Sequence, residues 1–313
     1  MKKSTITIFA PATVANVACG FDSLGFALNE PGDVIKLTRK AEPGVRITRI
    51  TGDNGRLPTG TDQNTAGVSV KALLEHTGET CGFDIEVHKQ MPLGSGLGSS
   101  SASTVGAVYG ANLLLDNPLP YEDLLPFALL GEKVACGAAH ADNVAPSLLG
   151  GFRLIRSYDP LDVIEVPHPE GLHCTVLHPH IEVMTEDSRK ILRQSVRLKD
   201  AIVQWSNFAG LITGLITGNY PLISRSLNDI IFEPVRSLLI PGYDDVKKAA
   251  MDTGALGCSI SGSGPSIFAL STSLSDARNV GDAMLASLKK TGIEGDVFVS
   301  PINKNGPRIV EEG

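Results

Sequence analysis

The chain carries at residues 92–101 the run Pro92-Leu93-Gly94-Ser95-Gly96-Leu97-Gly98-Ser99-Ser100-Ser101. This run lies between a predicted strand, Phe83 to Val87, and a predicted helix, Ser100 to Leu115, that is apolar on almost every side. Alternate glycines let backbone N–H groups converge on one anion, and the helix that follows adds the positive end of its dipole. The run therefore predicts a phosphate-binding loop, with a flexible turn capped by serine as the alternative.

Other glycine-rich phosphate loops fit this spacing less well. A Walker A loop needs a lysine after its last glycine, and no lysine occurs between Pro92 and Leu115. A dinucleotide fingerprint, GxGxxG, needs a glycine where Ser99 stands, although Asp116 has the position of the acid that follows such a loop. We therefore expect neither type, and a dinucleotide fold stays a distant alternative.

The composition is that of a globular protein of one large or two medium domains. The chain has 313 residues, of which 42% are hydrophobic and 19% are charged, which excludes a disordered or fibrous protein. Its 27 basic and 34 acidic residues give a net charge of −7. Such a charge provides no general attraction for nucleic acid or an anionic membrane, so any phosphate must be bound locally.

The cysteines and the N-terminal segment indicate a cytoplasmic protein. The five cysteines are widely spaced and form no CxxC pair, so neither a disulfide framework nor a zinc ribbon is expected. Pro11, Thr13 and Asn16 interrupt the apolar residues near the N-terminus, which argues against a signal peptide. The longest apolar stretch, Phe208 to Thr217, is far shorter than the roughly twenty residues that a membrane span requires.

Strand and helix patterns alternate irregularly along the chain, which favours an α+β fold over a doubly wound sheet. We expect Thr5 to Ile8 to form a strand that ends at Pro11, followed by a loop from Ala12 to Gly20. A turn at Tyr158-Asp159-Pro160 places the boundary between two domains, 1–158 and 159–313. Further strands are predicted at 34–38, 45–50, 152–156, 163–166, 172–177, 255–259 and 266–270, and helices at 64–76, 121–136, 199–217, 243–252 and 274–290, with one more starting at Thr185.

Two other runs place polar groups among small residues. Ser259-Ile260-Ser261-Gly262-Ser263-Gly264-Pro265-Ser266 is either a second ligand-facing turn or a plain hairpin between two strands. The first run, from Pro11 to Asp22, sets Asn16 and Asp22 among small neutral residues. These two side chains either bind a ligand or cap a turn.

In their order and separation, the three runs resemble the three signature motifs of the GHMP kinases. The run at 92–101 is similar to the family's PxGSGLGSSAA phosphate loop and departs from it at Ser101, where alanine is usual. The resemblance extends over the whole chain. Between the motifs the sequence looks like the homoserine kinase branch, and less like mevalonate kinase, at residues 28–33, 131–132, 140–146, 185–192, 233–236 and 239–241.

This resemblance implies a two-domain fold and a reaction. The N-terminal domain would be similar to ribosomal protein S5 domain 2, the C-terminal domain would be ferredoxin-like, and the active site would lie between them. The implied activity is the ATP-dependent phosphorylation of the side-chain hydroxyl of L-homoserine to O-phospho-L-homoserine, a step of threonine biosynthesis, by a homodimer. The alternatives are another small-alcohol kinase of the mevalonate type and a non-catalytic nucleotide-binding module.

The resemblance also implies which residues bind ATP. The phosphate loop, Pro92 to Ser101, would wrap the phosphates, while Ser100 and Glu132 would hold Mg²⁺. A hard cation on oxygen ligands would neutralise the β- and γ-phosphates in a loop that lacks a lysine. Without the resemblance, Glu132 would be interpreted as a surface carboxylate.

For the amino acid, the resemblance implies a site for a zwitterion. An acid complements the ammonium group and two arginines bind a carboxylate by forked hydrogen bonds. Gly262 and Ser263 would close the site from the second domain. The implied contacts are Asn16 and Asp22 with the ammonium group, Arg189 and Arg236 with the carboxylate, and His140, Asn143 and Thr185 near the hydroxyl.

Asp142 is the nearest candidate for a general base, since an aspartate is assigned that role in several GHMP kinases. In the homoserine kinase branch, the adjacent Asn143 is the residue that faces the hydroxyl. We therefore expect phosphoryl transfer without a strong base, by positioning and electrostatic stabilisation.

Overall fold

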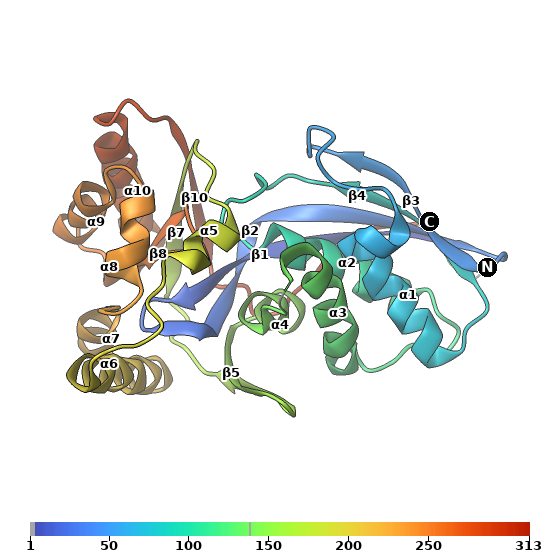
Figure 1. Ribbon diagram of the computed structural model, residues 1–313, viewed down its shortest axis with the longest axis horizontal. Helices are drawn as coiled ribbons and strands as arrows, with labels where there is room; N and C mark the ends of the chain where they lie inside the picture. The colour runs from blue at the N-terminus through green and yellow to red at the C-terminus, as the bar shows by residue number, and fades with distance from the viewer. Residues whose placement is uncertain (1–3, 138) are drawn as a thin grey trace.

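The computed structural model describes residues 4–137 and 139–313, which form two β-sheets with helices packed on them (Figure 1). Most strand pairs are antiparallel, and strands and helices do not alternate regularly, so the α+β prediction is confirmed. No helix in these two ranges is long and apolar enough to cross a bilayer.

The first sheet has seven strands and carries helices on one face. Its order is β11-β1-β2-β4-β3, with β5 paired to β2 and β6 paired to β5, and only β3 and β4 run parallel among these pairs. The strands are β1 (Thr5–Val17), β2 (Gly20–Lys40), β3 (Gly44–Thr51), β4 (Gly82–His88), β5 (Phe152–Tyr158), β6 (Leu161–Val166) and β11 (Arg308–Glu312). The helices are α1 (Thr65–Thr77), α2 (Ser99–Leu113), α3 (Leu125–Cys136) and α4 (Ala141–Leu149), with a 3₁₀ turn, η1 (Thr61–Gln63), before α1 and another, η2 (Tyr121–Leu124), before α3.

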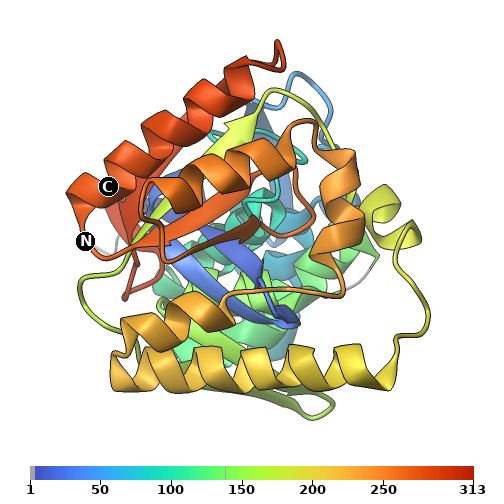
Figure 2. The same cartoon turned by 90° about the vertical axis from the view of Figure 1, so that its left-hand side faces the viewer.

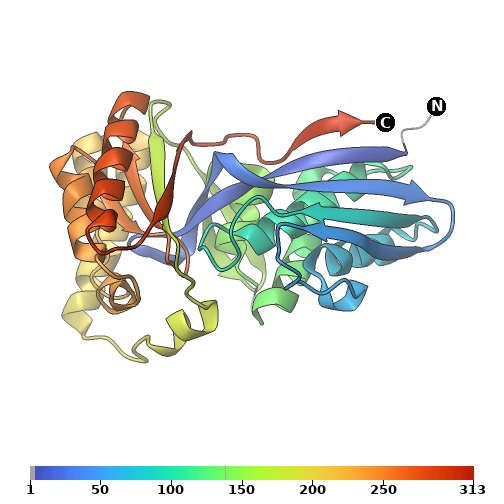
Figure 3. The same ribbon diagram turned by 90° about the horizontal axis from the view of Figure 1, so that it is seen from above.

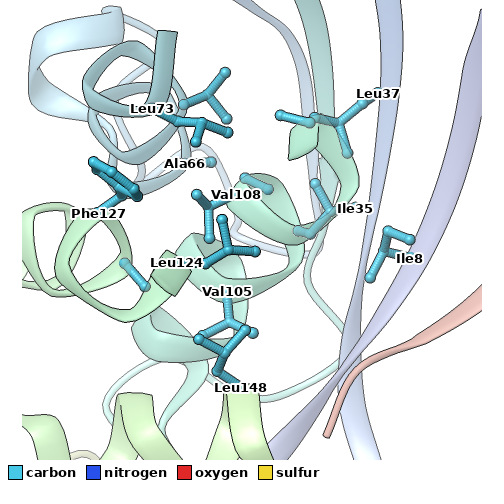
Figure 4. Close-up of a cluster of buried hydrophobic side chains, with 14 of the residues drawn as sticks. Ile8, Ile35, Leu37, Ala66, Leu73, Val105, Val108, Leu124, Phe127 and Leu148 are labelled. Carbon is cyan, nitrogen blue, oxygen red and sulfur yellow. The ribbon is translucent and has the colours of Figure 1, made fainter. Parts of the chain in front are cut away.

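Alternating apolar residues of the strands form the core of this layer. Ile8, Ile35 and Leu37 point from β1 and β2 toward Val105 and Val108 of α2 (Figure 4). All five side chains are fully buried. Each such side chain contributes about 1.5–3 kcal/mol by leaving water, which fixes α2 against the sheet directly behind the phosphate loop.

The second sheet has four antiparallel strands in the order β10-β7-β9-β8. An aromatic contact connects it to the first sheet. The ring centroid of Phe268 lies 6.1 Å from that of Phe26, which in turn lies 4.6 Å from that of Phe152. Figure 2 shows α6 as a long helix along the lower edge of this half. The elements are β7 (His173–Pro179), α5 (Thr185–Lys190), α6 (Leu198–Thr217), α7 (Tyr220–Ser226), α8 (Glu233–Arg236), η3 (Ser237–Leu239), α9 (Tyr243–Asp252), β8 (Gly257–Ile260), β9 (Ile267–Ser271), α10 (Leu274–Lys289) and β10 (Gly295–Pro301).

The prediction that the first strand ends at Pro11, with a loop from Ala12 to Gly20, is wrong. β1 continues to Val17 and turns directly into β2. The proline is tolerated because the ladder with β2 changes register between Pro11 and Thr13, where an N–H is not required for pairing. The resulting hairpin carries Asn16 and Asp22 to its tip.

Several elements were not predicted from the sequence. α4 contains Pro146 within its nine residues, a residue that normally argues against a helix interior. β11 was not predicted, whereas β6 matches the strand predicted at 163–166; both follow residue 158 in the chain but extend the first sheet, and β11 lies along β1 (Figure 3). The expected division at residues 158 and 159 stays a prediction.

Candidate active site

The phosphate loop connects β4 to α2 and is tightly enclosed. Gly94, Gly96 and Gly98 all have φ between 66° and 77°, the left-handed region that favours glycine. A Cβ atom on Gly96 would lie 2.4 Å from the carbonyl oxygen of Ser261, and one on Gly98 would lie 2.2 Å from Oγ1 of Thr13. Backbone conformation thus favours glycine at all three positions, and lack of space also requires it at 96 and 98.

The three runs singled out in the sequence meet around this loop. Thr13 N donates to Leu97 O at 3.0 Å, so the first run pairs with the loop backbone. Ser261 Oγ donates to Gly96 O at 2.7 Å, and Ser266 N donates to Ser95 O at 3.2 Å. The structure therefore brings together three segments that are far apart in the sequence, the loop and the third run by about half the chain.

A buried carboxylate that was not assigned a role from the sequence holds both ends of the loop. Asp33 accepts hydrogen bonds from Gln90 N at 2.7 Å and Met91 N at 3.0 Å before the loop, and from Ser99 Oγ at 2.9 Å after it. Lys89 Nζ bonds to the same carboxylate and to Ser99 O at 2.6 Å. Both side chains are almost completely buried, so this ion pair supports the loop from inside the protein.

The side chains of the loop serines have different surroundings. Ser99 is bound to Asp33, whereas the hydroxyls of Ser95 and Ser101 are buried without a hydrogen-bond partner in the described parts of the chain. Ser101 is fully buried behind the loop. Ser100 is partly exposed, and its hydroxyl donates to Glu132 Oε1 at 3.0 Å.

Ser100 and Glu132 form an oxygen pair suited to a hard cation. α2 and α3 position them, and Nδ1 of His140 lies 3.5 Å from the same Oε1 atom of Glu132. Within residues 4–137 and 139–313 no cluster of three or more acidic, histidine or cysteine side chains could hold a metal. One carboxylate and one hydroxyl, completed by substrate phosphates, are the kind of site that Mg²⁺ uses.

The tip of the β1–β2 hairpin holds the predicted amino-acid ligands in an unusual backbone conformation. Asn16 and Asp22 have φ of 55° and 52°. Asn16 Oδ1 accepts from Asp22 N at 2.8 Å, and Asn16 Nδ2 donates to Gly262 O at 2.8 Å. Asn16 thus ties the hairpin to the Gly262 turn, while the Asp22 side chain is partly exposed.

Both predicted arginines lie at this tip. Arg189 of α5 binds the Asp22 carboxylate with two hydrogen bonds, of 2.8 Å and 3.1 Å. Arg236 of α8 donates to Gly262 O at 3.0 Å and stacks over the ring of Phe21, 4.7 Å from its centroid. Burial, and next the charge of Arg189, lower the pKa of Arg236 to about 10, so it stays protonated at neutral pH.

Asp142 completes the group of charges. It is 1% exposed, and its Oδ1 has no hydrogen-bond partner among the described residues. Burial, followed by the nearby charge of Asp22, raises its pKa from 3.8 to about 6. We call Asp22, Asp142, Arg189 and Arg236 the charge cluster, which is electrically neutral when both acids are ionised.

The remaining predicted residues lie beside this cluster, except that the side chain of Thr185 is outside the described part of the structure. Thr13 Oγ1 donates to Asn143 Oδ1 at 2.8 Å, so the Asn143 amide keeps its Nδ2 hydrogens for a ligand. His140 directly precedes α4, and Ser263 follows Gly262 in the turn. Thr185 is the first residue of α5, but its side chain lies outside the described part of the structure.

Comparisons with known proteins agree with this architecture. The family models described as the GHMP kinases N terminal domain and GHMP kinases C terminal match residues 64–151 and 211–290. The chain is 50% identical to the homoserine kinase of Chlorobium phaeobacteroides (strain BS1), over 98% of this chain and 99% of that protein. The resemblance to the GHMP kinases over the whole chain, which the sequence indicated, is confirmed.

Solved structures give the same result. The crystal structure of homoserine kinase from Cytophaga hutchinsonii superposes with a TM-score of 0.97 at 56% identity, over 99% of this chain and 98% of that one. The L. major mevalonate kinase in complex with R-mevalonate has a TM-score of 0.68 at 18% identity, covering 96% of this chain and 97% of that chain, and shares the fold alone. The chain therefore belongs to the GHMP kinase family, and within it to the homoserine kinases.

Proposed function

We propose that this protein transfers the γ-phosphoryl group of ATP to the side-chain hydroxyl of L-homoserine, giving O-phospho-L-homoserine for threonine biosynthesis. One observation carries the proposal: the phosphate loop and the charge cluster adjoin. A Cβ atom on Gly98, the last glycine of the loop, would lie 2.9 Å from Oδ1 of Asn143, the residue next to Asp142. A phosphate in the loop and an amino acid at the cluster would therefore be neighbours.

The charge cluster selects a zwitterion. Asp22 binds the ammonium group, and Arg189 and Arg236 bind the carboxylate, in place of the contacts that Asp22 and Arg189 make with each other in the structure. Because the cluster is neutral, a ligand with no net charge leaves no buried charge uncompensated. Asn16, Gly262 and Ser263 close the site at the hairpin, and His140 and Asn143 lie toward the hydroxyl, where the family resemblance also assigns Thr185.

Ser100 and Glu132 would hold Mg²⁺ together with the nucleotide phosphates. The cation, when bound, neutralises charge on the β- and γ-phosphates. Glu132 is 2% exposed, so its carboxylate is confined to this position. The backbone of residues 94–98 supplies the N–H groups that bind phosphate oxygens, aided by the N-terminus of α2.

The transfer needs no strong base. The homoserine hydroxyl attacks the γ-phosphorus as the bond to the bridging oxygen of ADP breaks, and its proton passes to the transferred phosphoryl group. The Nδ2 group of Asn143 orients the hydroxyl, since its Oδ1 is occupied by Thr13. Correct placement and fixed charges supply most of the rate of such a loose transition state.

A coupled ADP-release assay tests the proposal with Mg·ATP and a panel of homoserine, threonine, serine, mevalonate and galactose. Turnover confined to homoserine is the expected result. Turnover on mevalonate or a sugar would favour another small-alcohol kinase and would contradict the roles given to Arg189 and Arg236. Nucleotide binding without turnover of any alcohol would instead favour a binding module.

Replacing Arg236 by Lys should weaken homoserine binding selectively. Lysine keeps the charge but loses the forked geometry and the stacking on Phe21. We expect KM for homoserine to rise about 10- to 100-fold, in line with the loss of a charge-assisted hydrogen bond worth about 1.5–3 kcal/mol, and KM for ATP to stay unchanged. Steady-state kinetics with each substrate varied in turn checks this, and an equal rise in both KM values would contradict it.

We also propose that the chain, with its two domains 1–158 and 159–313, forms a homodimer. The two subunits pair through α6. Leu198, Ile202, Trp205 and Ile216 are exposed on one side of this helix, Leu198 by 70% and Trp205 by 56%. Leu198, Ile202 and Trp205 follow one another at intervals of four and three residues, and Ile216 lies eleven residues after Trp205 on the same side, so together they make an apolar seam. Along the exposed side of α6, which the structure describes completely, Lys199 is the only charged residue.

A second copy fits this seam better than a charged partner would. α6 has 20 residues, so it is about 30 Å long. Two copies packed antiparallel about a two-fold axis would align apolar side chains along that length and put Lys199 near the negative end of the partner helix.

The variant Ile202→Glu/Trp205→Glu should therefore be monomeric. Light scattering after size exclusion measures its mass, and Met251→Glu, on the exposed surface of α9, is the matched control that should stay dimeric. Because Trp205 is the only tryptophan, dilution of the wild-type dimer should also shift its fluorescence to longer wavelength. A monomeric wild-type protein, or a dimeric double variant, would refute the seam.

A further inference from the structure

The segment between α7 and α8 folds around one buried carboxylate that the proposed reaction does not use. Asp229 is 6% exposed. Its Oδ1 accepts from Ile231 N at 2.9 Å, Phe232 N at 3.0 Å and Gln204 Nε2 at 2.8 Å, and its Oδ2 accepts from Glu233 N at 2.9 Å. Three of these four hydrogen bonds come from the backbone amides of residues 231–233 and fix that backbone.

These amides are the start of the short helix that carries Arg236. α8 spans Glu233–Arg236, a single turn, which is too short to be stable without external contacts. Gln204 holds the same segment a second time, since its Oε1 accepts from Ile230 N at 3.0 Å. The position of Arg236 therefore depends on how Asp229 and Gln204 hold the preceding residues.

The held segment also places an aromatic ring against the amino-acid site. Phe232 stacks on Phe21 with centroids 3.8 Å apart and an interplanar angle of 15°, and Arg236 lies over the same Phe21 ring. Phe21 directly precedes Asp22 at the hairpin tip. A shift of residues 231–233 would thus move both Phe232 and Arg236 relative to Asp22.

The opposite side of α8 has a separate tether. Glu233 Oε2 accepts from Ser259 Oγ at 2.6 Å, and its Oε1 is bound by Lys247 Nζ. This tether ties α8 to β8 and α9 and does not involve Asp229. A change at Asp229 should accordingly loosen the helix start and Arg236 without detaching α8 from the second sheet.

We propose that Asp229, supported by Gln204, is a positioning residue for the amino-acid carboxylate: it holds the start of α8 so that Arg236 lies between Phe21 and Gly262 O. This inference rests on the proposed function, in which Arg236 binds the homoserine carboxylate. Asp229 itself does not touch the substrate. Its effect on catalysis passes through Arg236.

The variant Asp229→Asn tests the inference. Asparagine has the same size, but its Nδ2 group is a donor and must face at least one N–H donor. We expect KM for homoserine to rise about 10-fold or more, with kcat within about threefold of wild type and KM for ATP unchanged. Gln204→Met removes one of the four hydrogen bonds to Asp229 and the acceptor of Ile230 N, but it keeps the carboxylate, so it should raise KM for homoserine by a smaller factor.

Coupling to Arg236 separates positioning from general damage. If Asp229 acts through Arg236, then adding Asp229→Asn to Arg236→Met should raise KM for homoserine by less than about twofold. Asp276→Asn, a carboxylate at the start of α10, is the matched control and should leave both KM values unchanged. A multiplicative effect in the double variant, a parallel rise in KM for ATP, or unchanged KM in both Asp229→Asn and Gln204→Met would overturn the inference.

The two proposals fail in different ways. If the wild-type protein does not phosphorylate homoserine, the proposed function is wrong. If the wild-type protein does so and the variants keep its KM, only the role of Asp229 is wrong. Thermal unfolding of each variant ensures that the kinetics refer to folded protein, and Gln204→Met keeps the test available should Asp229→Asn not fold.

Discussion

Lys89→Met is expected to lower the free energy of unfolding by about 3–5 kcal/mol, because it leaves the Asp33 carboxylate buried without its positive partner. The side chains of Lys89 and Asp33 are 1% and 0% exposed. Solvent therefore cannot compensate the remaining charge. Urea unfolding followed by circular dichroism measures the change.

The same variant should affect nucleotide binding more than amino-acid binding. Asp33 bonds to Met91 before the phosphate loop and to Ser99 after it, so a displaced carboxylate loosens both ends. We expect KM for ATP to rise, with KM for homoserine little changed. Kinetics at saturating concentration of the other substrate gives the two values.

Two further variants serve as controls for Lys89→Met. Lys71 pairs with Asp62 at 2.8 Å on the surface, with 48% and 77% of the side chains exposed, so Lys71→Met should change stability by less than about 1 kcal/mol. The double variant Asp33→Asn/Lys89→Met removes both charges and should recover part of the loss. Equal effects of Lys71→Met and Lys89→Met would show that burial is not the cause.

Asp142→Asn is expected to stabilise the protein above pH 6 while preserving most of its activity. Its folded pKa of about 6 lies above the ordinary 3.8, so the native state binds a proton more readily than the unfolded chain between these values. The contribution of Asp142 to stability therefore falls as pH rises through that window. Above pH 6 the buried charge costs about 3 kcal/mol.

The pH dependence of the difference in stability between Asp142→Asn and the wild-type protein provides the check. At pH 8 the variant should be more stable than wild type by up to about 3 kcal/mol, and at pH 4 the two should be nearly equal. The Nδ2 group of asparagine can take the position of Oδ1, which accepts from no N–H donor among the described residues. A difference in stability that stays constant from pH 4 to pH 8 would contradict the burial of charge as its cause.

Activity of the same variant decides the mechanism. General-base catalysis contributes about 10²–10⁴-fold, so a kcat within about tenfold of wild type supports transfer without a base. A loss of three orders of magnitude or more in a folded variant would instead make Asp142 the base. Asp22→Asn is the matched control, since it should raise KM for homoserine rather than lower kcat.

The sequence predicts the parts of this site that form local patterns. The glycines at 94, 96 and 98 could be predicted to bind phosphate because they and the helix that follows them lie in one short segment of the sequence. Together with the family resemblance, the sequence also indicated Arg189 and Arg236. The charge cluster that these arginines form with Asp22 and Asp142 lies at the tip of a hairpin, where the sequence predicted a loop.

The supports of the site could not be predicted in this way. Asp33 and Lys89 are 56 residues apart, and Gln204 and Asp229 are 25 apart, on different elements. Singly, each resembles an ordinary polar residue, and only the tertiary fold buries and pairs them. α4 was missed for a local reason, since Pro146 argues against a helix that packing nevertheless stabilises.

The pairing of β11 with β1 affects how this chain folds as it is synthesised. Without β11, β1 would be an edge strand of the first sheet, with unpaired N–H and C=O groups available to other chains. At typical rates of translation, almost the whole chain must emerge, on the order of tens of seconds later, before β11 can cover that edge. The free edge of β1 must therefore stay unpaired with other chains during synthesis. A shortened chain that lacks residues 308–312 would expose this edge permanently and be prone to aggregate.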